Sequence, residues 1–287
     1  MLRHPFYIGV WGDDMLTSLQ NEQVKYVVNL HKRKFREETG EFLIEGWRFV
    51  EEGVERGAHL TKVFFCSERK NESWPQLAEA LKNKGVPIVE VDERVLRKMS
   101  ATENPQGVLA IVKQPQWTWD DFVGMDSPVG KSALPLPLLL ILDGVQDPGN
   151  CGTILRTALA AGVTQVCLTE GTVDLYNLKV LRSTMGAIFS LKIITHCQPE
   201  EILKVCQSQN VPVFVGDAEG TDLYETHFAQ PMALVVGNEG NGPSAAFRGP
   251  GVKRITIPMS HQVESLNVAM ATGIILYEVR RRMTSTT

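Results

Sequence analysis

The chain has 287 residues, of which 43% are hydrophobic, and a formal net charge of −4. This length allows two ordinary domains, and the apolar content excludes a wholly disordered protein. The mildly acidic balance excludes a uniformly basic nucleic-acid-binding surface but allows a local basic patch. No apolar run approaches the roughly 20 residues that a membrane-spanning helix needs, so we expect no membrane association.

Residues 16–113 mix helical and strand patterns and predict a compact α/β domain. Two segments with helical spacing close on a glycine, as helix ends prefer, and predict helices at 16–40 and 47–57. Short apolar runs predict strands at 42–46, 62–66, 86–92 and 107–113.

The helix predicted at 16–40 includes KYVVNLHKRKFREE, whose cations are Lys25, Lys32, Arg33, Lys34 and Arg36. One interpretation is a solvated helix face with ion pairs four residues apart, such as Arg33–Glu37 and Lys34–Glu38. The other is contact with a phosphate backbone, because these cations cluster in an otherwise acidic chain. Together with the second half of the chain, the cluster favours RNA contact through Lys32, Arg33, Lys34 and Arg36.

Residues 114–137 are rich in Pro, Gly and Ser and lack a clear period, which predicts a linker. Within it, GMDSPVGKS (124–132) resembles a phosphate-binding loop. That loop requires four residues between its glycines and a helix after it, whereas this segment has five and is followed by prolines. We therefore expect no binding site for a nucleoside triphosphate in this segment.

Residues 138–287 alternate strands with helices, which predicts an α/β domain with a mostly parallel sheet. Apolar runs predict strands at 138–144, 164–171, 191–196, 211–217, 232–238 and 252–258. Helical spacing predicts helices at 151–162, 177–189, 199–209 and 265–283. Ligands in such sheets bind at the carboxyl ends of strands, so three loops that follow apolar strands are candidate site elements.

The first loop belongs to DGVQDPGNCGTILRTALAAG, residues 143–162. Asn150 lies just before the predicted helix, where it is either an N-cap alone or also a site residue. Arg156 follows within two turns, and helical side chains lean toward the helix start, so its guanidinium can reach the loop. The alternative for Arg156 is a solvated helix face, which its apolar neighbours disfavour.

The second loop lies in ALVVGNEGNGPS, residues 233–244. Its glycines permit positive φ angles and close backbone approach to a ligand. Their order is GxxGxG rather than the GxGxxG of dinucleotide-binding sites, which argues against a nucleotide-dependent oxidoreductase. Glu239, between the glycines, is either ordinary turn chemistry or a site residue.

The third loop opens IPMSHQVESLNVAMATGIILYEV, residues 257–279. An apolar helix begins here, yet Glu264, Ser265 and Asn267 stand at its start. Helix capping explains one such polar residue well and three poorly. If the three loops open on one sheet edge, Asn150, Arg156, Glu239, Ser265 and Asn267 line one pocket.

Other motifs are missing from the sequence. The histidines are scattered without metal-ligand spacing, so we expect no metal site. No GxSxG motif is present, which disfavours serine-hydrolase chemistry. The five cysteines form no CxxC pair and indicate free thiols in a reducing compartment. The first residues lack a secretory signal, so we expect the bacterial cytoplasm, or a mitochondrion or chloroplast if a transit peptide was removed.

In order, spacing and polar residues, the three loops resemble the three motifs of the SpoU (TrmH) family of RNA ribose methyltransferases, in the SPOUT superfamily. DPGNCGTILRTALAAG resembles motif 1, LVVGNEGNG motif 2, and IPMSHQVESLNVAMATGIILYE motif 3. The resemblance covers residues 138–283. Residues 16–113 are similar to the ribosomal-protein L30e-like substrate-binding domain found upstream in many members, most clearly in QNEQVKYVVNLHKRKFREETGEFLIEGWRFVEEG.

The resemblance implies a trefoil knot, S-adenosylmethionine bound in the knot, catalysis in a homodimer formed by the carboxyl-terminal domain, and an RNA substrate, ribosomal more readily than transfer RNA. The catalytic positions it implies are Asn150, Arg156, Glu239, Ser265 and Asn267. The cofactor-binding positions it implies are Gly237, Asn238, Gly240, Ile257, Pro258, Ser265 and Leu266.

The sequence leaves three alternative functions to compare with this one. A homologue that binds RNA without catalysis is disfavoured because all five polar positions are present. The branch of the superfamily that makes N1-methylguanosine has different motifs, whereas the SLN triplet with Asn150 and Arg156 points to ribose. The oxidoreductase lacks the required glycine order. Transfer RNA remains the alternative substrate.

Overall fold

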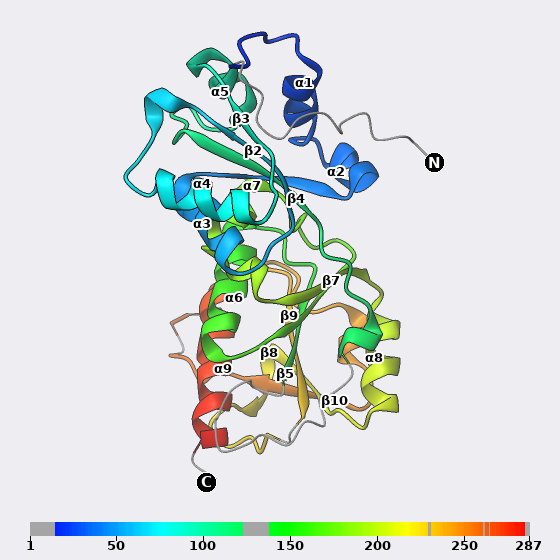
Figure 1. The fold of residues 1–287 in the computed structure, drawn as a ribbon. Helices are drawn as coiled ribbons and strands as arrows, with labels where there is room; N and C mark the ends of the chain where they lie inside the picture. The colour runs from blue at the N-terminus through cyan, green and yellow to red at the C-terminus, as the bar shows by residue number, and fades with distance from the viewer. Residues whose placement is uncertain (1–14, 123–137, 229–230, 261, 264, 285–287) are drawn as a thin grey trace. The chain divides into compact units, whose positions relative to one another are not determined.

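The computed structural model describes residues 15–122, 138–228, 231–260, 262–263 and 265–284. The chain divides into two compact units, Met1–Pro115 and Gln116–Thr287 (Figure 1). The first contains a four-stranded sheet in the order β1-β4-β2-β3, in which β4 is antiparallel to β1 and β2, and β3 is parallel to β2. Its strands are β1 (Glu41–Glu45), β2 (Leu60–Phe65), β3 (Ile88–Glu90) and β4 (Val108–Lys113).

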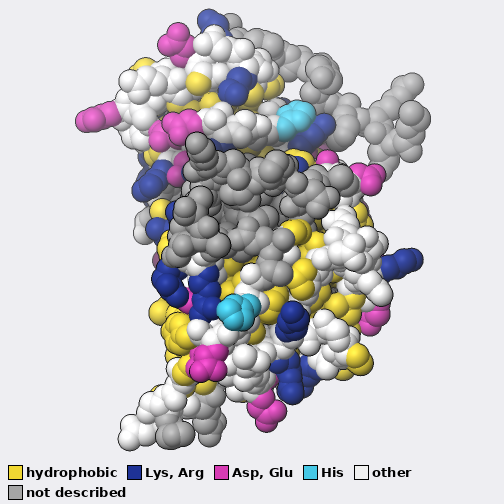
Figure 2. Space-filling view, turned by 90° about the horizontal axis from the view of Figure 1, so that it is seen from below, with side chains coloured by type: hydrophobic (Ala, Val, Ile, Leu, Met, Phe, Trp, Pro, Cys, Tyr) yellow, Lys and Arg dark blue, Asp and Glu magenta, His cyan; other side chains and the backbone are white. Residues whose placement is uncertain are grey.

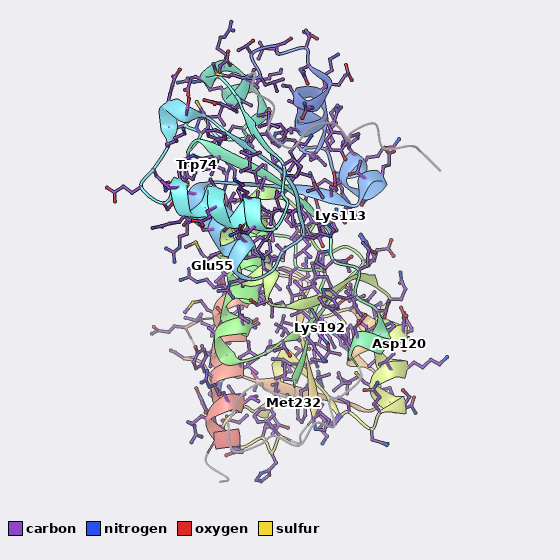
Figure 3. The ribbon with its side chains drawn as sticks, viewed as in Figure 1. Glu55, Trp74, Lys113, Asp120, Lys192 and Met232 are labelled. Carbon is purple, nitrogen blue, oxygen red and sulfur yellow. The ribbon has the colours of Figure 1, made fainter. Side chains whose placement is uncertain are left out.

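The helices of the first unit pack their apolar faces on this sheet. They are α1 (Glu22–Asn29), α2 (Arg33–Thr39), α3 (Trp47–Glu55), α4 (Trp74–Asn83) and α5 (Glu93–Met99). The strands and the helix at 47–57 were predicted, whereas α4 and α5 were not. Trp74 of α4, labelled in Figure 3, stacks on Phe65 of β2 with ring centroids 4.2 Å apart.

The single helix predicted at 16–40 is wrong, because the chain forms two helices there. Buried Leu30 ends α1, and the Arg36 guanidinium of α2 turns inward to donate to the Leu30 carbonyl at 2.7 Å. This contact joins two helices that a periodic pattern cannot separate. The predicted end at Gly40 is confirmed, since Gly40 has a φ of 64° that suits glycine.

The second unit has a six-stranded, wholly parallel sheet in the order β10-β8-β9-β5-β6-β7, which confirms the predicted parallel α/β architecture. Its strands are β5 (Leu138–Asp143), β6 (Gln165–Thr169), β7 (Lys192–Cys197), β8 (Val213–Asp222), β9 (Met232–Gly237) and β10 (Val252–Thr256). Every residue of β5 and β9 is buried, as expected of central strands covered on both faces. Met232, labelled in Figure 3, begins β9.

Helices cover both faces of the parallel sheet. They are α6 (Pro148–Ala161), α7 (Leu178–Thr184), α8 (Pro199–Ser208) and α9 (Val268–Thr284). In Figure 1, α6 and α9 lie side by side, and α8 lies on the opposite face. Arg280 donates to the Ala160 carbonyl at 2.9 Å and so fastens α9 to α6. The helix predicted at 177–189 is interrupted, because Met185 and Gly186 adopt positive φ angles before the 3₁₀ turn η3 (Ala187–Phe189).

Part of the predicted linker folds onto the second unit. The 3₁₀ turn η2 (Trp119–Phe122) buries Phe122, and the Trp119 indole N–H donates to Glu201 at 2.6 Å. Lys192 of β7 donates to the Asp121 carbonyl at 2.8 Å; Figure 3 labels Lys192 and the neighbouring Asp120. Residues 123–137, with the loop-like segment 124–132, lie outside the described residues.

The described helices and the cysteines can be compared with what the sequence predicts for membrane association and for disulfides. Within the described ranges, no helix combines the length and apolar character needed to cross a bilayer. All five cysteines are buried and free. Burial raises the pKa of the Cys151 thiol to about 12, so this residue beside Asn150 is a neutral thiol at physiological pH.

Candidate active site

The pairing of two central strands brings the first two candidate loops together. Asp143, the last residue of β5, lies opposite Gly237, the last residue of β9, in the parallel register. The Asn238 side chain then donates from Nδ2 to the Gly144 carbonyl at 2.8 Å. The loops after β5 and β9 therefore leave the same edge of the sheet, although they are 94 residues apart in sequence.

The cap of α6 is Asp147 rather than Asn150. The Asp147 carboxylate accepts from the Asn150 backbone N–H at 2.8 Å, and Pro148 follows at the first helical position. Asp followed by Pro is a common helix start, and this signal was available in the sequence. Because Asp147 performs the capping, the Asn150 side chain is free to make contacts with other loops.

Asn150 links all three candidate loops through hydrogen bonds. Its Nδ2 donates to Glu239 Oε1 at 3.1 Å, and its Oδ1 accepts from Asn267 Nδ2 at 2.9 Å. Asn267 also caps α9, because its Oδ1 accepts from the backbone N–H groups of Ala269 at 2.9 Å and Met270 at 3.3 Å. The capping interpretation of Asn267 is therefore correct but incomplete.

These bonds fix the orientation of both side-chain amides. Two backbone donors require the Asn267 oxygen to face α9, so its nitrogen faces Asn150. Asn150 must then present its oxygen to Asn267 and its nitrogen to the Glu239 carboxylate. Each amide nitrogen uses one of its two hydrogens in these hydrogen bonds and retains the other for a further acceptor.

Glu239 holds the glycine-containing loop against the start of α6. Its carboxylate also accepts from the backbone N–H groups of Gln146 and Asp147, both at 3.1 Å. Burial opposes ionisation of the Glu239 carboxyl, but the hydrogen bonds from Asn150 and these backbone amides outweigh burial and lower its pKa. Glu239 is thus an ionised anchor with three donors, a poor choice for a proton acceptor at neutral pH.

Arg156 and Ser265 lie close in sequence to Asn150 and Asn267, but their side chains do not join the hydrogen bonds that link Glu239, Asn150 and Asn267. Both are exposed, and neither side chain has a hydrogen bond or ion pair with any residue that the structure describes. Arg156 is on the outer side of α6, six residues beyond Asn150. Glu264, the third polar residue noted at this helix start, lies outside the described residues.

The glycine-containing loop is tightly folded at its base. A Cβ at Gly237 would lie 2.2 Å from the Pro243 nitrogen, so only glycine fits there. Asn238 exchanges two backbone hydrogen bonds with Gly242, and its Oδ1 accepts from the N–H of Gly240 and of Asn241, each at 3.0 Å. The side chain of Asn238 is thus a loop brace.

The remaining predicted cofactor positions follow β10 or precede α9. Ile257 is half-buried directly after β10, and Pro258 is exposed. Leu266 is 38% exposed. Ser244, at the end of the loop that begins at Gly237, was not predicted; its Oγ is shielded from solvent and has no hydrogen-bond partner among the described residues.

The basic cluster of the first unit separates into exposed and buried groups. Lys32, Arg33 and Lys34 are exposed, and Arg33 and Lys34 form the expected pairs with Glu37 and Glu38 at 2.7 and 3.9 Å. Arg36 is only 6% exposed. Its inclusion as an RNA-contacting cation is therefore corrected, because its guanidinium is used inside the domain.

Both units of the chain match known proteins. Residues 137–277 match the SpoU rRNA Methylase family, and residues 21–110 match the MRM3-like substrate binding domain. The chain is 33% identical to the 23S rRNA (guanosine(2553)-2'-O)-methyltransferase of Bacillus subtilis, covering 92% of this chain and 98% of that protein. It is 32% identical to the human mitochondrial rRNA methyltransferase 3, covering 88% and 70%. The AdoMet-bound rRNA methyltransferase from Sinorhizobium meliloti has a TM-score of 0.79 and 30% identity, covering 94% and 98%.

Substituting Glu239→Gln should lower the free energy of unfolding at pH 7 by about 1 kcal/mol, since the site is partly exposed and the neutral amide binds the backbone donors less strongly. A depressed carboxyl pKa contributes stability above the unfolded-state pKa that is lost as pH falls through the folded-state pKa. The difference between wild type and variant should therefore shrink below about pH 4. Urea unfolding measures it, with Glu22→Gln, an exposed pair with Lys25, as the control. Equal stabilities of wild type and Glu239→Gln at pH 7 would contradict the anchoring role.

Proposed function

Because the chain belongs to the SpoU rRNA methylase family, we propose that it transfers a methyl group from S-adenosylmethionine to a ribose 2′-hydroxyl of ribosomal RNA. The observation that carries this proposal is the hydrogen-bonded chain from Glu239 through Asn150 to Asn267, which joins all three family motifs. The similarity to rRNA methyltransferases favours ribosomal over transfer RNA.

The loop residues fit S-adenosylmethionine. Glycine backbone without side chains allows close approach to an adenine edge, which offers both donors and acceptors. The shielded and unpartnered Ser244 Oγ is a further group that a ligand can satisfy. The residues that would hold the cofactor are Gly237, Asn238, Gly240, Ile257, Pro258, Ser265 and Leu266. When bound, it supplies a methyl group already activated by a positively charged sulfur.

The polar side chains of the site orient the ribose, and none of them is a strong base for its 2′-hydroxyl. The Glu239 carboxylate is ionised and already accepts three hydrogen bonds, and Cys151 is a neutral thiol. Exposed Arg156 binds an RNA phosphate and stabilises the charge that develops on the 2′-oxygen. Asn150 and Asn267 each offer one amide N–H, and Ser265 a hydroxyl, to orient the sugar. The hydroxyl proton then leaves to water or to an RNA phosphate.

An exposed apolar face on α9 supports a homodimer of the carboxyl-terminal units. Met270 is 63% exposed and Tyr277 is 50% exposed, and their spacing of seven residues places them on one face of the helix. Val263 and Leu266, shortly before the helix, are further exposed apolar residues at 50% and 38%. Exposed apolar groups at helical spacing are typical of interfaces. A trefoil knot, in which the carboxyl-terminal segment threads a loop of the second unit, belongs to the same proposal.

The exposed cations at the start of α2 support RNA contact by the first unit. Lys34 is 88% exposed and pairs with Glu38 only at 3.9 Å, so little of its charge is neutralised. Figure 2 shows Lys and Arg interspersed with Asp and Glu over the face it presents, which is consistent with the net charge of −4. RNA contact must therefore depend on local groups such as Lys32, Arg33 and Lys34.

Bacterial and mitochondrial relatives support a cytoplasmic or organellar location.

Arg156→Ala should leave cofactor affinity unchanged and lower methyl transfer by about 10²–10³-fold, because it removes one group that stabilises the transition state. Radiolabelled methyl transfer to ribosomal and transfer RNA measures the rate, and calorimetry measures cofactor binding. Nuclease digestion with mass spectrometry identifies the 2′-O-methylated nucleotide. Arg254→Ala, at a partly exposed arginine of β10 that pairs with exposed Glu219, is the control. Normal turnover by Arg156→Ala would remove Arg156 from the chemistry, and methylation of a base would overturn the ribose assignment.

Reversing two charges, Lys32→Glu with Lys34→Glu, should weaken RNA binding and reduce the slope of log affinity against log salt by about 1.4–1.8. A filter-binding titration at several salt concentrations measures both quantities. The matched control reverses two exposed lysines of the same unit, Lys82→Glu with Lys84→Glu. RNA contact at α2 is refuted if both double variants bind RNA equally well.

Met270→Glu with Tyr277→Glu should convert the dimer to a monomer, because two carboxylates would be buried in an apolar interface. Light scattering after size-exclusion chromatography should then give a mass near 31.9 kDa, against twice that value for the wild type. Tyr224→Glu, at an exposed tyrosine elsewhere in the unit, should leave the dimer intact. A wild-type mass near 31.9 kDa would contradict the proposed dimer.

A further inference from the structure

Asp143 is a buried carboxylate at the end of an otherwise apolar strand. It is 5% exposed, and the residues before it in β5 are all leucine or isoleucine. Its Oδ2 accepts from the Ser244 backbone N–H at 2.6 Å, and its Oδ1 accepts from the Thr169 hydroxyl at 2.9 Å. Burying a carboxylate is costly unless hydrogen bonds replace its hydration, so these two contacts must hold it.

The contact with Ser244 closes the cofactor loop. The loop begins at Gly237, which lies directly opposite Asp143 in the neighbouring strand, and Ser244 marks its return. Gly237 touches Pro243 so closely that no Cβ fits between them. Asp143, at the end of β5, therefore holds Ser244 close to the end of β9, where the loop begins.

The first half of the loop is braced within itself and against the segment after β5, where Asn238 donates to the Gly144 carbonyl and Glu239 accepts from the Gln146 and Asp147 backbone N–H groups. Asn238 fixes the turn at 240–242, and Arg248 donates to the Asn241 carbonyl at 3.0 Å. None of these contacts reaches Ser244. Of the hydrogen bonds among the described residues, the one to Asp143 is what ties the Ser244 N–H to the sheet. Loss of this acceptor would leave a partly buried N–H without a partner and release the end of the loop.

We propose that Asp143 is a positioning residue for the methyl transfer reaction, which sets the shape of the cofactor-binding loop through its hydrogen bond to the Ser244 backbone. This inference rests on the proposed function, because the loop is assigned to S-adenosylmethionine there. Because Asp143 is buried and its two oxygens already accept from Ser244 and Thr169, it acts on the loop backbone rather than on the cofactor or the ribose. Its effect should therefore fall on cofactor affinity rather than on the rate of the bound complex.

A purely structural role for Asp143 predicts a different pattern. If the carboxylate served only the stability of the fold, its loss would lower the melting temperature without a selective change in cofactor binding. The Asp143→Asn variant is informative because its side-chain oxygen can still accept from the Ser244 N–H. Its nitrogen can donate to the Thr169 hydroxyl, and that hydroxyl can then donate its own hydrogen to the Leu142 carbonyl. Asp143→Asn should therefore rescue most of what Asp143→Ala loses.

The experiment titrates the full-length wild type, Asp143→Ala and Asp143→Asn with S-adenosylmethionine by calorimetry, and measures methyl transfer and melting temperature. Asp143→Ala should weaken cofactor affinity about tenfold, the effect of an unsatisfied donor, and raise KM for the cofactor equally. Its kcat at saturating cofactor should stay within about threefold of the wild type. Asp143→Asn should bind within about threefold of the wild type. Thr226→Ala, which removes a buried hydroxyl elsewhere in the unit, is the stability control and should not change affinity.

The outcomes separate the two levels of inference. If the wild type binds no S-adenosylmethionine, the proposed function fails. If the wild type binds it and Asp143→Ala binds equally well, or if Asp143→Asn is as weak as Asp143→Ala, the positioning role fails. If Asp143→Ala does not fold, Asp143→Ser replaces it, because the serine side chain is polar but too short to reach Ser244. The same tenfold loss of affinity for S-adenosylmethionine is expected, which corresponds to about 1.4 kcal/mol.

Discussion

The site depends on the parallel pairing of β5 with β9. This register places Asp143 opposite Gly237, so two loops distant in the chain begin side by side at one sheet edge. The packing of α9 on α6 then brings the start of α9 to the same place, and Asn267 reaches Asn150. If the strands slipped by one residue, their side chains would exchange faces and the loops would no longer meet in this arrangement.

Side-chain amides and one ionised carboxylate connect the loops, and this has a chemical consequence. Glu239 accepts from the Asn150 side chain and from two backbone N–H groups, and Asn150 in turn accepts from Asn267. Such a network is rigid and presents a few N–H donors in fixed directions. A reaction whose methyl donor is already activated requires placement more than a strong base, so a pre-arranged set of donors suits it.

Several features of the site were within reach of the sequence, and others were not. The three loops and the residues Asn150, Glu239 and Asn267 could be identified because glycines and polar residues directly follow apolar strands or precede an apolar helix. The cap at Asp147 was missed although the Asp-Pro pair signals it. Arg36 was misplaced because a cation on a helical pattern gives no sign that its guanidinium will turn inward to a carbonyl six residues earlier.

By itself, the sequence determined the α/β class, the parallel second sheet, most strands, and the identity of the motif residues, because these follow from local periodicity and from chemistry carried within short segments. Only the tertiary structure decided that Glu239 binds the start of α6, that Asn267 meets Asn150, and that Asp143 holds Ser244. Those contacts join residues about 90 to 120 positions apart. They exist because strand order and helix packing bring the segments together, and neither is encoded in any single stretch of the chain.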